Sequence, residues 1–257
     1  MPASDTHDLL PGARDDTGLE PDNHGVTAIL DVVQRLAAAD VPSCVVGVRA
    51  LRYYGAGREW DLCIPDSMLD TAREVIISTD DGKYQAARPP PPVPWSRRHV
   101  FSCFRLKGYN FWVLLVPSSD CFVDPSLTEH VEKSRNGVPY ASMIQFARSL
   151  LLQQLTADLA DFIDGMDLDV DWGGRNVGFA GLQEESVKFN ALRNERVITD
   201  GGNRSGFCYP MDLGELWRRK ASKEAKEKRV EPMKKGRYLT SWRRINSEDP
   251  RTRDRPV

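Results

Sequence analysis

The most constraining feature of the sequence is an apolar run that ends in a glycine and leads directly into a helical pattern. The run SCVVGV, residues 43–48, is short enough for a buried strand, and RALRYYG supplies about two helical turns after it. Glycines then interrupt the pattern, and EWDLCIP alternates apolar and polar residues, which is typical of a strand. A strand, a helix and a second strand in this order predict a chain that mixes both kinds of element.

Similar patterns continue on both sides of this segment. The predicted helices cover residues 26–36, 68–77, 141–155 and 156–165, and further strands are predicted over 99–106 and 109–117. The proline-rich stretch RPPPPVPWSRR, residues 88–98, predicts an extended surface loop because successive prolines exclude both helix and ladder pairing. Residues 170–213 show only weak patterns, for which we expect short helices.

The apolar runs and the cysteines indicate the cellular compartment in which the chain works. No apolar run approaches the roughly 18 residues that a membrane span requires. The N-terminal stretch MPASDTHDLLPGARDD carries acids where a secretion signal would carry basic and then apolar residues. The cysteines lie far apart without a CxxC pair, which argues against a disulfide framework and a cysteine-based zinc site. We therefore expect a soluble protein of the cytoplasm or the nucleus, without membrane contact.

Charge is unevenly distributed along the chain. Residues 214–257 hold 15 of the 35 Lys and Arg residues but only 7 of the 37 Asp and Glu residues, whereas the first 24 residues are acidic and rich in turn formers. We therefore divide the chain into a disordered lead over 1–24, a main domain over 25–175, a short helical extension over 176–217 and a basic, largely disordered tail over 218–257.

The segment VVGVRALRYYGAGREWDLCIPD, residues 45–66, resembles the nucleotidyltransferase superfold, in the branch of toxin-antitoxin and antibiotic-modifying nucleotidyltransferases and many uncharacterised fungal proteins. The family pattern is Gly-Gly or Gly-Ser before a helix, then an Arg and a strand with two carboxylates one residue apart. The similarity extends over roughly residues 26–180, through GVPYASMIQFARSLL and DLADFIDGMDLDVDWG. It implies an α/β (α+β) fold, a nucleotidyltransferase-like mixed sheet flanked by helices, with a helical C-terminal portion.

The chemistry of this pattern follows from its parts. A glycine turn before a helix offers free N–H groups and the positive end of the helix dipole to a triphosphate. Two carboxylates at positions i and i+2 of a strand face the same side, where they can hold Mg²⁺ ions that bridge the phosphates. Catalysis of this kind consists mostly of positioning and charge neutralisation.

The resemblance assigns roles to five positions. Gly47 and Val48 match the nucleotide-binding turn, and Arg58 and Asp61 match the catalytic arginine and the first carboxylate. Asp61 would hold the metal together with Asp120, which follows the strand over 109–117. An active member of the family would therefore use Mg²⁺ and a nucleoside triphosphate as cofactors.

Two positions depart from the family pattern. Val48 stands where the second small residue belongs, and its β-branched side chain crowds the approach to a phosphate. Cys63 stands where the second carboxylate belongs, and a thiol is a poor ligand for Mg²⁺. The strand over 109–117 contains no acid, so Asp120 is the nearest substitute for a third carboxylate and Asp124 is another.

Two basic features of the sequence can each be interpreted in two ways. Arg97, Arg98 and His99 form a cluster after the proline loop that could meet a phosphate, although a solvated loop explains it equally well. The basic tail could neutralise nucleic-acid phosphates. The aromatic residues in this tail and directly before it, which could stack on unpaired bases, are Trp217, Tyr238 and Trp242. The acids interspersed among the tail's cations favour a charge-patterned surface helix instead.

These observations lead to three hypotheses. The first is a catalytically degenerate nucleotidyltransferase-fold protein, a pseudoenzyme with an accessory or regulatory role in a fungal cell, for which the resemblance suggests secondary metabolism. The second is an active Mg²⁺-dependent nucleotidyltransferase that moves a nucleoside monophosphate to a hydroxyl or phosphate acceptor. The third is a nucleic-acid-binding protein that uses residues 218–257.

Overall fold

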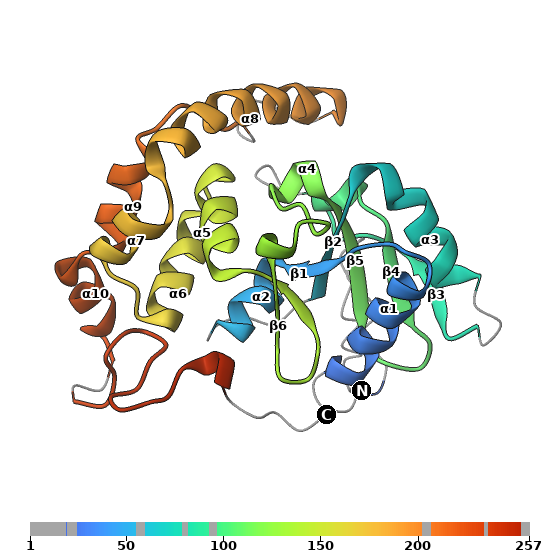
Figure 1. Ribbon diagram of the computed structural model, residues 1–257, viewed down its shortest axis with the longest axis horizontal. Coiled ribbons are helices and arrows are strands. Elements are labelled where there is room, and N and C mark those ends of the chain that lie inside the picture. Colours follow the sequence, from blue (N-terminus) through green and yellow to red (C-terminus); the bar gives the residue numbers. More distant parts are fainter. Residues whose placement is uncertain are drawn as a thin grey trace, which may run out of the picture.

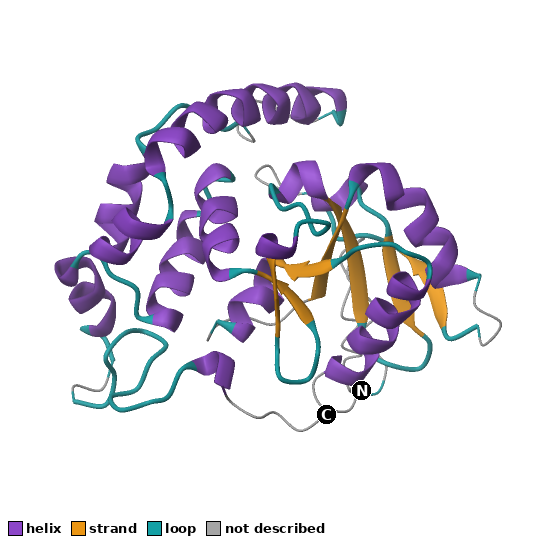
Figure 2. Cartoon of the chain, viewed as in Figure 1, coloured by secondary structure: helices purple, strands orange, loops and turns teal. Residues whose placement is uncertain are grey.

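A mixed seven-stranded sheet forms the centre of one half of the chain (Figures 1 and 2). The computed structural model describes residues 19, 25–54, 60–78, 82–92, 97–201, 207–233 and 236–252. The strand order is β3-β4-β5-β2-β1-β7-β6. The strands are β1 Cys44–Val46, β2 Trp60–Ile64, β3 Tyr84–Ala87, β4 Cys103–Leu106, β5 Trp112–Pro117, β6 Val131–Lys133 and β7 Pro139–Ala141.

The strand that carries Asp61 lies in the middle of this sheet. β2 runs parallel to β5 and antiparallel to β1, and all five of its residues are buried. β5 is itself almost entirely apolar, as expected for a strand covered on both faces. The sheet therefore places Asp61 inside the molecule rather than on an open surface.

Helices cover the sheet and form the rest of the molecule. They are α1 Val26–Ala38, α2 Gly47–Tyr53, α3 Leu69–Ile77, α4 Ser118–Cys121, α5 Met143–Leu152, α6 Thr156–Met166, α7 Val170–Asn176, α8 Phe179–Thr199, α9 Leu213–Ala221 and α10 Lys223–Val230. In Figure 1, α1 and α3 lie beside the sheet, whereas α5 to α10 gather in the opposite half, with α8 as an arm at its top. The predicted α/β class, a mixed sheet with helices and a helical C-terminal portion, is confirmed.

An aromatic cluster at the C-terminal end of α2 joins the two halves. The ring of Tyr54 stacks on Phe146 of α5 and meets Phe162 of α6 edge-on. Its hydroxyl donates a hydrogen bond of 2.6 Å to the carbonyl oxygen of Ala141. Burial of these large rings contributes several kcal/mol by order of magnitude, roughly 2 kcal/mol or more for each ring. The helix that follows Gly47 is thereby fixed against both the sheet and the helical half.

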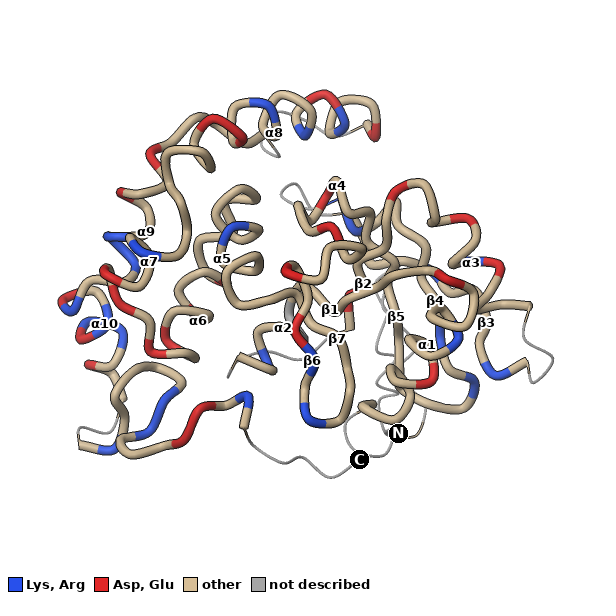
Figure 3. Tube along the Cα trace, in the orientation of Figure 1, with Lys and Arg blue, Asp and Glu red and all other residues tan. Residues whose placement is uncertain are grey.

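The described part of the predicted tail packs against α6. Arg229 of α10 donates from two nitrogens to the carboxylate of Asp164, which is fully buried. Thr240 donates to the carbonyl oxygen of the same residue, and Ser241 donates to its carboxylate. Acidic residues are interspersed among the basic residues of α10 (Figure 3). Residues 223–230 and 236–252 thus form defined structure within the segment for which the sequence predicts disorder, while the domain boundaries stay a prediction.

Two further expectations concern the ends of the chain and the membrane. Of the acidic lead, only Leu19 is described, in a bridge with Tyr109. Among the residues that the structure describes, no helix combines the length and apolar character needed to cross a bilayer.

Candidate functional site

Gly47 and Asp61 meet where β1 passes into α2. Val46, the last residue of β1, pairs with Asp61 in the register of β1 and β2. Gly47 has a φ of +63°, in the left-handed region, and a Cβ atom on it would collide with Oδ2 of Asp61. The glycine is therefore required by two things at once, the backbone turn and the close approach of the carboxylate.

A cavity of about 400 Å³ brings most of the predicted site residues together. Gly47, Asp61 and Asp120 all line it, although they come from the start of α2, from β2 and from α4. Arg58 and the side chain of Val48 lie outside the described part of the chain. The geometry thus unites three of the five positions that the family resemblance singles out.

An arginine neutralises Asp61 inside this cavity. Nη1 of Arg98 donates to Oδ2 of Asp61 at 2.5 Å, and the Asp61 side chain is 6% exposed. Arg98 is the last residue of the proline-rich stretch and begins a short 3-10 helix, Arg98–Val100. A charge-assisted bond of this length between largely buried groups fixes the orientation of the carboxylate.

Asp120 is neutralised in the same way, by two arginines. Nη1 of Arg97 donates to its Oδ1 at 2.5 Å, and Arg196 of α8 approaches its Oδ2 at 3.5 Å. Arg97 also donates to Asp200 at 2.6 Å. Burial alone would lower the pKa of Arg97, but the hydrogen bond to Asp200 and the charge of Asp120 outweigh it and raise that pKa. Both acids assigned to the metal are therefore held by cationic side chains.

Two further charged residues of the cavity escaped the sequence analysis. Asp158 lies in the first turn of α6, and its pKa is raised by burial and by the charge of Asp161, against the opposing charge of Arg98. Arg193 of α8 is buried and lines the cavity as well. Asp158 could have been noticed as an acid at the start of a predicted helix. Arg193 lies in a stretch without a clear pattern, so no sequence signal marks it.

Cys63 does not line the cavity and packs against another thiol. It is fully buried, its thiol donates to the carbonyl oxygen of Val123 at 3.3 Å, and its sulfur lies 3.2 Å from that of Cys121. Burial raises the pKa of the Cys63 thiol well above its usual range, so this group stays protonated at neutral pH. A neutral, buried thiol cannot take over the role of the second metal-binding carboxylate.

The residues of the cavity do not fit the Mg²⁺ ion that the superfold implies. Magnesium requires several oxygen ligands at short distance, usually including one or two free carboxylates. Here Asp61 and Asp120 each hold a guanidinium group, and the described chain contains no group of three His, Cys, Asp or Glu side chains suited to a metal ion. An incoming cation would have to displace arginines that already supply the positive charge.

The chain is similar to known proteins in structure but not in sequence. No protein-family model matches the sequence, and no curated protein matches it. An antigenic nucleotidyltransferase-like protein from Paracoccidioides brasiliensis is 13% identical, with a TM-score of 0.42; the match covers 71% of this chain and 94% of that one. ANT(2")-Ia, solved in complex with adenylyl-2"-tobramycin, is 8% identical, with a TM-score of 0.36, over 65% of this chain and 97% of that one.

The Megavirus polyadenylate synthase is a third structure of this kind. It is 12% identical, with a TM-score of 0.31, and the match covers 92% of this chain but 54% of the viral one. Because these scores reach no more than 0.42, the function has to be argued from the cavity's own residues.

Proposed function

We propose that this chain is a catalytically degenerate nucleotidyltransferase-fold protein with an accessory or regulatory role, whose cavity binds a ligand without transferring a nucleotidyl group. The observation that supports the proposal is the ion pairing of both candidate metal ligands, Asp61 with Arg98 and Asp120 with Arg97. A role in a fungal cell, in secondary metabolism, is the setting that the sequence resemblance suggests for such a pseudoenzyme.

The burial of these two ion pairs makes it costly to open them for a metal ion. Nucleotidyl transfer in this superfold needs a divalent cation between protein carboxylates and phosphates. The carboxylates of Asp61 and Asp120 are only 6% and 9% exposed. Separating a buried carboxylate from its partner costs about 3–5 kcal/mol when nothing replaces the partner. A metal would have to offset this cost at two positions and would still lack the oxygen ligand that Cys63 does not provide.

Calorimetric titration with ATP, GTP, CTP and UTP, each with and without Mg²⁺, tests the proposal. We expect that Mg²⁺ leaves the heat of each titration unchanged, because no free carboxylate pair is present in the described cavity to recruit it. The matched variants are Asp61→Ala in the cavity and Asp70→Ala, whose carboxylate is 92% exposed in α3. Mg²⁺-dependent binding that Asp61→Ala abolishes and Asp70→Ala preserves would overturn the proposal.

That result would support the second candidate, an active Mg²⁺-dependent nucleotidyltransferase with a hydroxyl or phosphate acceptor. The specific observation in its favour is that Gly47, Asp61 and Asp120 line one cavity. In that case Arg98 and Arg97 would turn from the acids to the phosphates when a nucleotide binds, and the triphosphate would bring the metal with it.

The nucleic-acid hypothesis receives no comparable support from the tail. The indole of Trp217 is fully buried, so it is not accessible for stacking on a base. Lys226 and Arg229 form ion pairs with Asp167 and Asp164, at 2.8 Å and 2.6 Å. Cations that are engaged inside the protein contribute less to the neutralisation of phosphates.

A further inference from the structure

Three buried cysteines meet where β1, β2 and α4 come together. Cys44 of β1 pairs with Cys63 of β2 in the register of the two strands. The thiol of Cys121 in α4 donates to the sulfur of Cys63 at 3.2 Å. All three thiols are free, and the sequence contains no CxxC pair that would announce the cluster. The fold therefore creates a contact between thiols that can become a bond.

Cys121 is the member of this cluster that lines the first cavity, the one that also holds Asp61 and Asp120. Cys44 and Cys63 are fully buried and are not among the described residues that line it. With a volume of about 400 Å³, the cavity can admit a small neutral oxidant such as hydrogen peroxide. An oxidant that enters the cavity thus reaches Cys121 first and finds Cys63 behind it.

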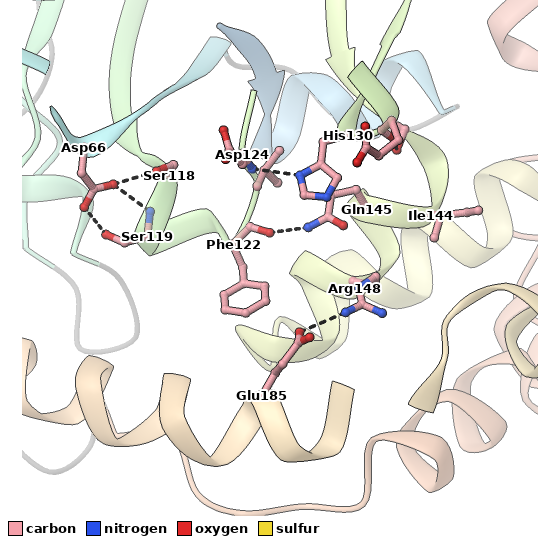
Figure 4. Close-up of a pocket in the computed structure, with 13 residues that line it drawn as sticks. Asp66, Ser118, Ser119, Phe122, Asp124, His130, Ile144, Gln145, Arg148 and Glu185 are labelled. Atoms are coloured by element: carbon pink, nitrogen blue, oxygen red, sulfur yellow. Dashed lines mark hydrogen bonds and ion pairs between the residues drawn. The ribbon is translucent and has the colours of Figure 1, made fainter. Parts of the chain in front are cut away.

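Hydrogen bonds hold α4 in place beside β2 and α5. Ser118 and Ser119 donate to the carboxylate of Asp66, just beyond β2, and line a second cavity of about 720 Å³ (Figure 4). Ser149 of α5 donates to the carbonyl oxygen of Cys121. Groups that the fold already holds in contact react with each other far more readily than with molecules in solution.

A disulfide bond requires only a small movement of the two sulfur atoms. An S–S bond is about 2.05 Å long, so the sulfurs of Cys63 and Cys121 would approach by roughly 1 Å. Rotation of the side chains and a slight shift of α4, which has only four residues, can supply this approach. The bond therefore does not require the sheet to rearrange.

We propose that Cys121 and Cys63 form a reversible disulfide bond when a peroxide enters the first cavity. The sulfur of Cys121 attacks one oxygen of hydrogen peroxide and the O–O bond breaks. Cys121 becomes a sulfenic acid, and its proton leaves with the departing hydroxide as water. The sulfur of Cys63 then attacks that of Cys121. The S–O bond breaks, the S–S bond forms, and the second hydroxide leaves as water with the proton of Cys63.

This bond joins the two segments that carry the acids of the cavity. Cys121 directly follows Asp120, and Cys63 lies two residues after Asp61. Since the two cysteines are 58 residues apart, the bond also closes a long loop and restricts the unfolded chain. The inference does not rest on the proposed function, because the bond can form whether or not the cavity holds a ligand.

Oxidation of the natural chain with hydrogen peroxide, followed by alkylation of the remaining thiols and peptide mapping without reduction, tests the proposal. We expect one pair of peptides linked through Cys63 and Cys121, which dithiothreitol separates. The melting temperature should rise by roughly 5 °C or more on oxidation and return on reduction. A link between Cys44 and Cys63, a sulfinic acid at Cys121 without any link, no reaction at all, or an unchanged melting temperature would each overturn the proposal.

Variants then assign the two roles. In Cys63→Ala the sulfenic acid of Cys121 lacks its resolving thiol, so dimedone, a reagent for sulfenic acids, should trap it. Cys121→Ala should give neither a link nor a dimedone adduct at Cys63. The matched control is Cys208→Ala, because Cys208 is also buried but lies outside the cavity, and it should form the link as the natural chain does. A dimedone adduct at Cys63 in Cys121→Ala would contradict the assigned order. Circular dichroism verifies that each variant is folded, and the mapping of the natural chain stands without them.

Discussion

Asp61 and Cys63 occupy the same face of β2 in the sequence pattern, but their surroundings differ. Asp61 lies at the cavity against Gly47 and Arg98, whereas Cys63 is covered by Val123 and Cys121. The alternation of the strand predicts the shared face correctly. It cannot predict which part of that face is covered, because the covering segment follows 60 residues later in the chain. The pairing with Arg98, 37 residues away, is equally invisible to local patterns.

The contact between Gly47 and Asp61 gives a prediction at the residue scale. Gly47→Ala places a methyl group against Oδ2 of Asp61 and adds the strain of a left-handed backbone, so the free energy of unfolding should fall by about 2–4 kcal/mol. Urea denaturation measures this loss. Gly137→Ala is the matched control, because Gly137 also has a positive φ but no described atom lies within 4 Å of the place that its methyl group would take.

The control separates strain from collision. Gly137→Ala should lower the free energy of unfolding by only about 1 kcal/mol, because it adds backbone strain without a collision. Equal losses in Gly47→Ala and Gly137→Ala would mean that Asp61 moves aside without cost, and the close approach would then not explain the glycine.

The sequence predicts the helices and strands that have a clear apolar pattern. α5 and α6 bury continuous apolar faces and fall where helical spacing places them. α8 is a single helix of 21 residues, where only short helices are expected, because its buried face includes polar residues. These are Ser186, Asn190 and Arg193. The short strands β3, β6 and β7 are also absent from the sequence prediction, since three or four residues carry too little periodicity.

The attachment of α10 to α6 yields a prediction about elements. Arg229→Met leaves the fully buried carboxylate of Asp164 with Ser241 as its remaining side-chain partner in the described chain. We expect a loss of about 2–4 kcal/mol in the free energy of unfolding, and earlier cleavage of the C-terminal segment in limited proteolysis. Lys223→Met in the same helix is the control, because its ion pair with Glu227 is largely exposed and should contribute less than about 1 kcal/mol. Identical proteolysis of both variants would contradict this role of Asp164.

At the scale of the whole molecule, ion pairs connect the sheet half to α8 beside the first cavity. Arg97 bonds to Asp200, which directly follows α8, and Arg196 of α8 reaches Asp120 and Asp66. Figure 1 shows α8 passing above this end of the sheet. The two residues of each ion pair lie far apart in the sequence. The composition therefore predicts that charged residues are present, but it does not predict that they connect the two halves.

Asp66 makes this connection dependent on pH. Burial would raise its pKa, but hydrogen bonds from the side chain and backbone of Ser119 and from Ser118, together with the charge of Arg196, lower it. A carboxyl group whose pKa is lower in the folded state stabilises the fold above its unfolded pKa of about 3.9. That stabilisation is lost as the pH falls through the folded pKa.

Asp66→Asn should therefore lower stability at neutral pH and lose less further stability than the natural chain between about pH 5 and pH 3. Urea denaturation over a series of pH values measures both effects. Asp70→Asn controls for the removal of one negative charge from the same region, since its side chain is largely exposed and does not contact α4 or α8 in the described chain. If Asp66→Asn and the natural chain lost stability in parallel on acidification, the bonds from Ser118, Ser119 and Arg196 would not be what ties α8 to the sheet at this point.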